Sequence, residues 1–220
     1  MSDARAELVA AGAALSAAGL SPGTSGNLSV RVGGRIYMTP TGARLEALDP
    51  EALAVLDADA PLDAGHTAGP APSKEFPLHR AFYRRDPATR AVVHLHSAHA
   101  AACSCLPPWS RRSALAPLTP YFVMRVGQTP LIPYAAPGDP EQARQLELLD
   151  FPFHAALLQN HGPITAGDTL ARAVDAAVEL EEVSRLTLLL KDTGPRVLTT
   201  EEAGALARRY GTVWEPVAGR

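Results

Sequence analysis

The sequence has little cysteine, no strong excess of one charge and no long apolar run, and each absence argues against a class of protein. Its 220 residues include 20 Lys and Arg against 23 Asp and Glu, a net charge of −3. This balance predicts no basic surface, so nucleic acid is not an expected partner. No apolar span reaches the roughly 18 residues that a membrane helix needs, so no membrane association is expected.

The cysteines and the charged N-terminus both favour a cytoplasmic protein. Cys103 and Cys105 are one residue apart, too close to form a useful disulfide, and their apolar surroundings predict buried free thiols. Asp3, Arg5 and Glu7 stand where a signal peptide needs an uncharged apolar core. We therefore expect the protein to be cytoplasmic.

Nucleotide-binding motifs are also missing. The sequence has no Gly-Lys-Ser/Thr phosphate loop and no Gly-x-Gly-x-x-Gly. Two loops rich in Gly, Thr and Ser, at residues 23–27 and 39–42, flank a predicted hairpin. Backbone N–H groups and hydroxyls in such loops can hold a phosphate, although ordinary turns have the same composition. On their own, the loops leave both interpretations open.

Apolar residues make up 46% of the chain, enough for one sizeable core, and we expect a single domain over residues 1–220. Apolar patterns predict strands over 28–32, 35–39, 91–96, 155–158 and 164–166, with short edge strands over 121–126 and 129–134. Helices are predicted over 3–18, 73–85, 98–106, 139–149, 168–191 and 200–210, with Ser2 or Asp3, Ser73 and Asp139 as N-caps. The result is an α/β fold with a mainly antiparallel central sheet wrapped by helices.

Some charged and polar side chains are assigned structural roles. Glu179, Glu181 and Glu182 are assigned to the solvated side of the long helix. His79 and Phe82, three residues apart on an earlier helix, are assigned to packing.

The strand that ends in His94-Leu95-His96 is the first candidate for chemistry. Two residues apart on a strand, these imidazoles point to the same face about 7 Å apart, so both can bind one metal ion. A lone histidine is more often structural, but His161 also follows a buried strand and is the best third ligand. His66 and His154 are worse placed, and His99 is expected behind the ligands. Three histidines leave a coordination position open, as in catalytic zinc sites.

Glu75 is the carboxylate expected beside this site. It is predicted in the first turn of a helix, where it serves either as a general acid or base or as an ordinary residue that stabilises the helix dipole.

Five motifs in order resemble the class II aldolase/adducin-head family, whose type member is L-fuculose-phosphate aldolase. They are Gly23-Thr24-Ser25-Gly26-Asn27, Thr39-Pro40-Thr41-Gly42, Pro72-Ser73-Lys74-Glu75, His94-Leu95-His96-Ser97 and Asn160-His161-Gly162-Pro163, within a resemblance that covers about residues 5–210. The resemblance implies a three-layer α/β/α fold, one zinc ion per subunit, and a homotetramer with active sites between neighbouring subunits.

The resemblance also assigns roles to residues. It implies metal ligands at His94, His96 and His161, a catalytic acid/base at Glu75, and a proton donor at Tyr121 lent by the adjacent subunit. It implies that substrate phosphate is held by Asn27, Thr41, Gly42 and Ser73. Lys74 stands where the aldolase has a small hydroxyl residue, so a cation is expected to bind the phosphate or a substrate carboxylate.

The motifs around Lys74, His94 and Tyr121 are most similar to one branch, the 3-oxo-tetronate 4-phosphate decarboxylases. This resemblance implies a zinc-dependent lyase that converts a phosphorylated sugar acid to dihydroxyacetone phosphate and CO2 through a metal-stabilised enediolate. The alternatives are a class II sugar-phosphate aldolase of the L-fuculose or L-ribulose type, a methylthioribulose-phosphate dehydratase, and a non-enzymatic adducin-like module. Mn, Co or Fe can also occupy a site with three histidines.

Overall fold

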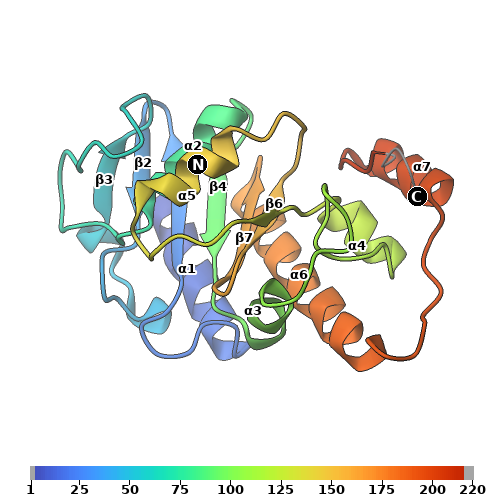
Figure 1. Cartoon of the computed structure of the whole chain (residues 1–220). Coiled ribbons are helices and arrows are strands. Elements are labelled where there is room, and N and C mark those ends of the chain that lie inside the picture. Colours follow the sequence, from blue (N-terminus) through green and yellow to red (C-terminus); the bar gives the residue numbers. More distant parts are fainter. Residues whose placement is uncertain (1–2, 216–220) are drawn as a thin grey trace.

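A seven-stranded sheet in the order β3-β2-β1-β4-β7-β6-β5 runs through the protein, which is seen here in a computed structural model that describes residues 3–215 (Figure 1). Its strands are β1 (Asn27–Val32), β2 (Arg35–Met38), β3 (Ala54–Asp57), β4 (Ala91–His94), β5 (Leu131–Ile132), β6 (Ala155–Leu158) and β7 (Gly162–Gly167). Neighbouring strands are antiparallel except β5 and β6, which are parallel. The predicted fold class is therefore confirmed.

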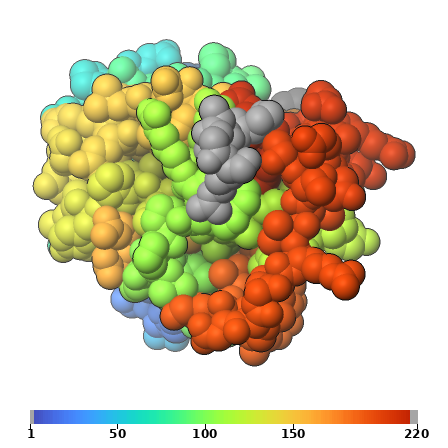
Figure 2. Space-filling model, turned by 45° about the vertical axis from the view of Figure 1, so that its right-hand side comes forward, coloured from blue at the N-terminus to red at the C-terminus, as the bar shows by residue number. Residues whose placement is uncertain are grey.

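Helices cover both faces of this sheet. They are α1 (Ala4–Ala17), α2 (Phe76–Arg85), α3 (Ala98–Ser104), α4 (Pro120–Arg125), α5 (Pro140–Glu147), α6 (Leu170–Leu190) and α7 (Thr200–Tyr210), with short 3-10 turns η1 (Leu45–Ala47) and η2 (Pro50–Ala52). Helices α1, α3 and α6 pack on one face, while α2 and α5 pack together on the other. Helices α4 and α7 pack against each other, α4 also packs against α6, and Figure 2 shows α7 in red at one side of the molecule.

Strand β4 shows why an unbroken apolar run forms a strand here. Val92 packs among side chains of α2 and α5, while Ala91 and Val93 pack among those of α1 and α6. All three are fully buried. Because both faces of the sheet are covered, alternation of polar and apolar residues is not needed. Burial of each valine stabilises the fold by about 1.5–3 kcal/mol.

Two predicted helix starts are confirmed by their caps. The Asp3 side chain accepts a hydrogen bond from the Arg5 backbone N–H at 3.0 Å, and the Asp139 side chain accepts one from the Glu141 N–H at 2.9 Å. Ser2, the alternative cap for α1, lies outside the described residues.

The start of α2 corrects the assignment of Ser73 as its cap. The helix begins at Phe76, and Glu75 occupies the cap position without a side-chain cap bond. Residues 73–76 form a turn in which the Phe76 N–H bonds to the Ser73 carbonyl at 3.1 Å. Pro77 lies in the first helical turn, where its missing N–H costs nothing. The Glu75 carboxylate is thereby free to point elsewhere.

The segment 121–126 was predicted as an edge strand, and this prediction is wrong. It forms α4, which Thr119 caps by accepting the Phe122 N–H at 3.1 Å, with Pro120 as the first helical residue. A Thr-Pro pair is a strong helix start, and here it outweighs the strand preference of Tyr, Phe and Val. The other predicted edge strand is confirmed in part, as β5.

Two further assignments need correction. Glu179 is 8% exposed and pairs with Arg125, and Glu181 binds the start of α3, so neither lies on a solvated face as predicted. Glu182 is exposed, as expected.

Cys103 is buried as predicted, but Cys105 is exposed. Within residues 3–215 no helix is long and apolar enough to span a membrane.

Candidate active site

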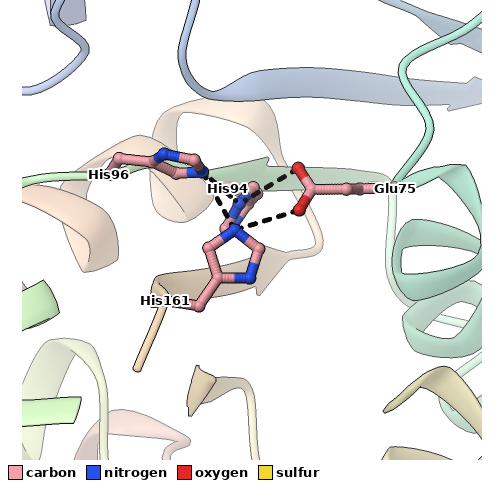
Figure 3. Close-up of side chains that lie close together, drawn as sticks. All are labelled: Glu75, His94, His96 and His161. Carbon is pink, nitrogen blue, oxygen red and sulfur yellow. Dashed lines mark hydrogen bonds and ion pairs between the residues drawn. The ribbon is translucent and has the colours of Figure 1, made fainter. Parts of the chain in front are cut away.

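Four side chains converge at one end of the sheet, on the face covered by α2 (Figure 3). His94 is the last residue of β4 and His96 follows two residues later, while His161 lies in the turn between β6 and β7. Glu75 precedes α2. One ligand atom from each residue lies within 4.8 Å of the other three, so the group can hold a metal ion. The structure brings together the three histidines that the sequence analysis selected as ligands.

Distances within the group fit a small divalent cation. His96 Nε2 lies 3.1 Å from His94 Nε2 and 3.0 Å from His161 Nε2. The Glu75 oxygens lie 3.2 Å from His94 Nε2 and 3.0 Å from His161 Nε2. Tetrahedral zinc with bonds of about 2.0 Å to nitrogen and oxygen places its ligands about 3.3 Å apart. The four donors therefore have the chemistry and the spacing of a metal site.

Burial and charge set the protonation of the group. Burial alone would raise the pKa of Glu75, but the neighbouring His94 and His161 outweigh it and hold that pKa far below its usual range. Burial, together with His94 and His161, lowers the pKa of His96 to about 4. Glu75 is therefore ionised and His96 neutral near pH 7, which are the forms that bind a cation.

Two of the imidazoles are oriented by their own surroundings. His94 Nδ1 donates to the Pro163 carbonyl at 2.9 Å, which leaves the Nε2 lone pair directed at the site. His161 follows Asn160, whose φ of 56° is left-handed, a conformation that asparagine tolerates. Ser104 of α3 accepts the His161 N–H at 3.2 Å through its hydroxyl and the Asn160 N–H at 3.2 Å through its carbonyl. These bonds turn the His161 ring into the site.

The site includes one candidate ligand that sequence analysis gave another role. Glu75 was expected as an acid or base beside the metal, whereas its carboxylate lies among the ligand atoms. The remaining histidines examined for this role lie elsewhere. His66 and His154 are outside the group, and His99 pairs with Glu181 at 2.7 Å.

The residues expected to hold phosphate divide into two sets. The Thr41 N–H bonds to the Ala71 carbonyl at 3.0 Å and the Ser73 N–H to the Thr39 carbonyl at 3.1 Å, so the two loops lie side by side. Thr41 and Gly42 are exposed and Ser73 is half-buried, so all three are accessible to solvent. Asn27 differs, because it is buried and its amide binds Glu75 and His79.

Lys74 and Tyr121 are both accessible. Lys74 is exposed, directly between Ser73 and Glu75 in the chain. Gly138 lies against it so closely that a Cβ there would be 3.1 Å from Lys74 Cβ. Tyr121 is 56% exposed on α4, with the Arg125 guanidinium 5.3 Å from its ring centroid. Arg125 in turn pairs with Glu179 at 3.6 Å.

Sequence analysis missed a buried polar set beside Glu75, made of Ser29, His79 and Tyr83. His79 was assigned to packing, and it is buried, but both of its ring nitrogens are hydrogen-bonded. The spacing of these residues in the sequence could have revealed the set. Residues 79 and 83 lie four apart on one face of α2, residue 75 lies four before them at its cap position, and residues 27 and 29 share one face of a strand.

The fold and the four converging side chains define an α/β protein with a candidate metal centre of three imidazoles and one carboxylate. Residues 6–188 match the family described as Class II Aldolase and Adducin N-terminal domain. The chain belongs to this family.

Named relatives cover nearly the whole chain. The 3-oxo-tetronate 4-phosphate decarboxylase of Pectobacterium atrosepticum is 41% identical over 205 residues, which are 93% of this chain and 92% of the relative. The L-fuculose phosphate aldolase of Escherichia coli is 34% identical over 199 residues, 88% of this chain and 87% of the relative. Both similarities extend well beyond the site.

Solved structures agree with these sequence relationships. The crystal structure of YgbL from Klebsiella pneumoniae superposes with a TM-score of 0.85 at 41% sequence identity, and the match covers 92% of this chain and 96% of the YgbL chain. An L-fuculose 1-phosphate aldolase superposes with a TM-score of 0.79 at 26% sequence identity, and the match covers 96% of this chain and 97% of the aldolase chain.

Proposed function

We propose that this protein is a zinc-dependent lyase that decarboxylates a 3-oxo-tetronate 4-phosphate to dihydroxyacetone phosphate and CO2. The convergence of His94, His96, His161 and Glu75 carries the proposal, because this chemistry needs a Lewis acid. The relative named for this reaction, at 41% identity, supplies the substrate class. Zinc suits three imidazoles and a carboxylate, although Mn, Co and Fe bind the same ligand types.

When bound, the metal ion would stabilise negative charge on substrate oxygens, and the chain's own residues do the rest. The bond between the carboxylate carbon and its neighbour breaks, its electron pair stays on the neighbouring carbon, and a proton must reach that carbon. Glu75 begins ionised, because His94 and His161 lower its pKa, so it first accepts or relays a proton. Tyr121 carries a phenol proton and is the second candidate donor.

Substrate binding is assigned to the exposed rim. Thr41 and Ser73 offer their hydroxyls to the phosphate and Gly42 offers its backbone N–H, because the N–H groups of Thr41 and Ser73 already bond to backbone carbonyls. Lys74, next to Glu75 in the chain, offers an ammonium to the carboxylate that is lost as CO2. Tyr121 belongs to an exposed surface and is assigned to the site of a neighbouring subunit in a homotetramer.

A class II aldolase is the second candidate function. The L-fuculose phosphate aldolase relative, at 34% identity over 88% of this chain, favours it. In that reaction the same electron pair is released by loss of an aldehyde instead of CO2. An aldolase substrate has no carboxylate at this position, so the role assigned to Lys74 would disappear.

A turnover assay tests the proposal. Zinc-loaded protein is given a 3-oxo-tetronate 4-phosphate generated in situ, and CO2 and dihydroxyacetone phosphate are measured together. We expect both products in equal amounts and their loss with a chelator. Cleavage of fuculose or ribulose phosphates without CO2 release would identify an aldolase instead.

Metal content tests the ligands separately. Alanine variants of His94, His96 and His161 are expected to lose bound zinc, as measured by elemental analysis after dialysis. His154→Ala, which changes a histidine outside the group, is the matched control and should keep zinc. A ligand variant that retains one zinc per chain would remove that residue from the site.

A further inference from the structure

A chain of hydrogen bonds runs behind the candidate metal site, between β1 and α2. Glu75 Oε2 lies 2.8 Å from Asn27 Nδ2, and Asn27 Oδ1 lies 2.6 Å from His79 Nε2. His79 Nδ1 lies 2.8 Å from Ser29 Oγ, which lies 2.8 Å from the Tyr83 hydroxyl. All five residues are buried.

The regular geometry of the two elements explains this ladder. Four residues of helix rise about 6 Å and two residues of strand about 6.7 Å, so the side chains at both spacings stay in step. Asn27 is also paired with His94 across the sheet, which places its amide at the candidate metal site. The ladder therefore connects the interior of the fold to the Glu75 carboxylate.

The direction of each bond follows from the groups at its ends. An ionised carboxylate only accepts, so Asn27 donates through Nδ2 and presents its Oδ1, an acceptor, to His79. His79 must then carry its proton on Nε2, which leaves a lone pair on Nδ1 for the Ser29 hydroxyl. The Ser29 oxygen in turn accepts from Tyr83. In this direction each of the four hydrogen bonds has one donor and one acceptor.

Reversing the donors and acceptors along the ladder leaves unfavourable contacts at both of its ends. With the proton on His79 Nδ1, the Ser29 oxygen would accept it, and either the Ser29 or the Tyr83 hydroxyl proton, both buried, would have no partner in the ladder. The Asn27 amide would flip to satisfy His79 Nε2, and its oxygen would face the Glu75 carboxylate at hydrogen-bond distance. Unpaired buried polar groups and facing oxygens are both costly.

We propose that His79 is a positioning residue that, through Asn27, holds the ionised Glu75 carboxylate against the three histidines. The proposal rests on the proposed function for what Glu75 does in turnover, but the ladder itself does not. It also assigns the Asn27 side chain to Glu75 in place of the phosphate. One N–H of the Asn27 amide is all that remains for substrate.

The tautomer of His79 is a test that needs no activity and is measured on the parent chain. Nitrogen-15 NMR of labelled metal-free protein distinguishes a ring protonated on Nε2 from one protonated on Nδ1, with the resonance assigned by its loss in His79→Gln. We expect the Nε2–H form at neutral pH. The Nδ1–H form, or a doubly protonated ring, would overturn the proposal.

Zinc affinity is the second test, by competition with a chelating dye. His79→Leu removes the donor to Asn27 and is expected to weaken zinc binding about 10–100-fold, the usual cost of losing a group behind a ligand. His79→Gln keeps an N–H at the end of the side chain and should recover most of that loss. His154→Gln, outside the ladder, is the control and should bind zinc like the parent chain.

A purely structural role for His79 predicts a different pattern. Both His79 variants would then lower the melting temperature while binding zinc as tightly as the parent, and this result would overturn positioning. The outcome is separable from the proposed function. Absence of CO2 release with the expected tautomer and zinc affinities refutes only the decarboxylase, whereas turnover with parent-like zinc binding in His79→Leu refutes only the positioning role.

Discussion

At the scale of single residues, Lys74 and Glu75 are neighbours in the chain, but one side chain is exposed and the other is buried. Glu75 is 7% exposed and points at three imidazoles, whereas Lys74 is exposed to solvent. The chain has one other lysine, Lys191, beyond the end of α6. Gly138, at a φ of 87° that disfavours other residues, lets its loop contact the Lys74 backbone and Cβ.

Replacement of Lys74 tests carboxylate recognition. Lys74→Ser is expected to raise KM for the sugar-acid phosphate about tenfold, the loss of one charge-assisted hydrogen bond, with zinc content unchanged. Steady-state kinetics and elemental analysis measure both quantities. Lys191→Ser, an exposed lysine elsewhere, is the control. Equal KM values for Lys74→Ser and the parent chain would end this assignment.

His79 predicts a pH dependence of stability. Burial, with a smaller contribution from His94, lowers its pKa from 6.5 to about 3 in the folded chain. The unfolded chain therefore binds a proton near pH 6.5 that the folded chain does not. From this group, the free energy of unfolding should fall by about 1.4 kcal/mol per pH unit as the pH drops below about 6.5.

Urea unfolding of the metal-free protein at several pH values measures this slope. His79→Gln should make it shallower by about one proton, whereas His66→Gln, which removes an exposed imidazole, is the control. An unchanged slope in His79→Gln would show that the His79 ring already binds a proton in the folded state.

At the scale of elements, α3 depends on α6 for its N-terminus. Ser97 occupies its cap position but makes no side-chain cap bond. Glu181 of α6 accepts the His99 N–H at 3.0 Å and the Ala100 N–H at 2.8 Å instead. These backbone bonds lower the pKa of Glu181 although burial opposes them. The cap fixes the chain just after His96.

Neutralising this cap tests its contribution. Glu181→Gln should lower the free energy of unfolding by about 1–3 kcal/mol, the cost of weakening charge-assisted bonds to a half-buried helix end. Glu182→Gln breaks an exposed ion pair with Arg185 and should cost at most about 1 kcal/mol. Chemical denaturation compares the two variants. Equal losses would mean that the carboxylate at 181 has no special capping role.

At the scale of the whole molecule, the exposed α4 surface raises the question of assembly. Tyr121 is 56% exposed and Tyr210, at the end of α7, is 44% exposed. Large aromatic side chains are exposed singly in many monomers, but here they belong to the paired helices α4 and α7. Our proposal that Tyr121 completes the site of a neighbouring subunit gives this surface a function.

Mixed assemblies test that proposal. Tyr121→Phe and His161→Ala are each expected to lose most activity, at least about 10²-fold. Co-expressed chains should regain up to about one quarter of the parent activity, because that share of sites would combine an intact His161 with an intact neighbouring Tyr121.

A second pair of variants provides the control. Glu75→Gln and His161→Ala affect the same site within one chain, so their mixture should stay inactive. Activity that does not return in the Tyr121 mixture, although both chains are present in one assembly, would place Tyr121 outside the shared site.

Much of the fold could be predicted because its signals are local. The hairpin at β1 and β2, the cap at Asp139 and the apolar run of β4 all depend on residues within one or two turns of each other. Prediction failed at α4, where a local Thr-Pro start competed with strand-forming side chains. It also failed at Glu179 and Glu181, whose burial depends on helices that are distant in sequence.

The sequence by itself determined the chemistry available to this protein. His-x-His at the end of an apolar run and a third histidine in a turn already indicated a metal site, because ligand type and strand periodicity are local properties. Only the tertiary structure decided that the Glu75 carboxylate lies among the three histidines and that Asn27 connects it to His79. Asn27 and Glu75 are 48 residues apart, and their contact depends on the register between a strand and a helix. Periodicity shows which side chains share one face of a helix or strand. Packing alone sets which faces meet and which residues along them come into contact.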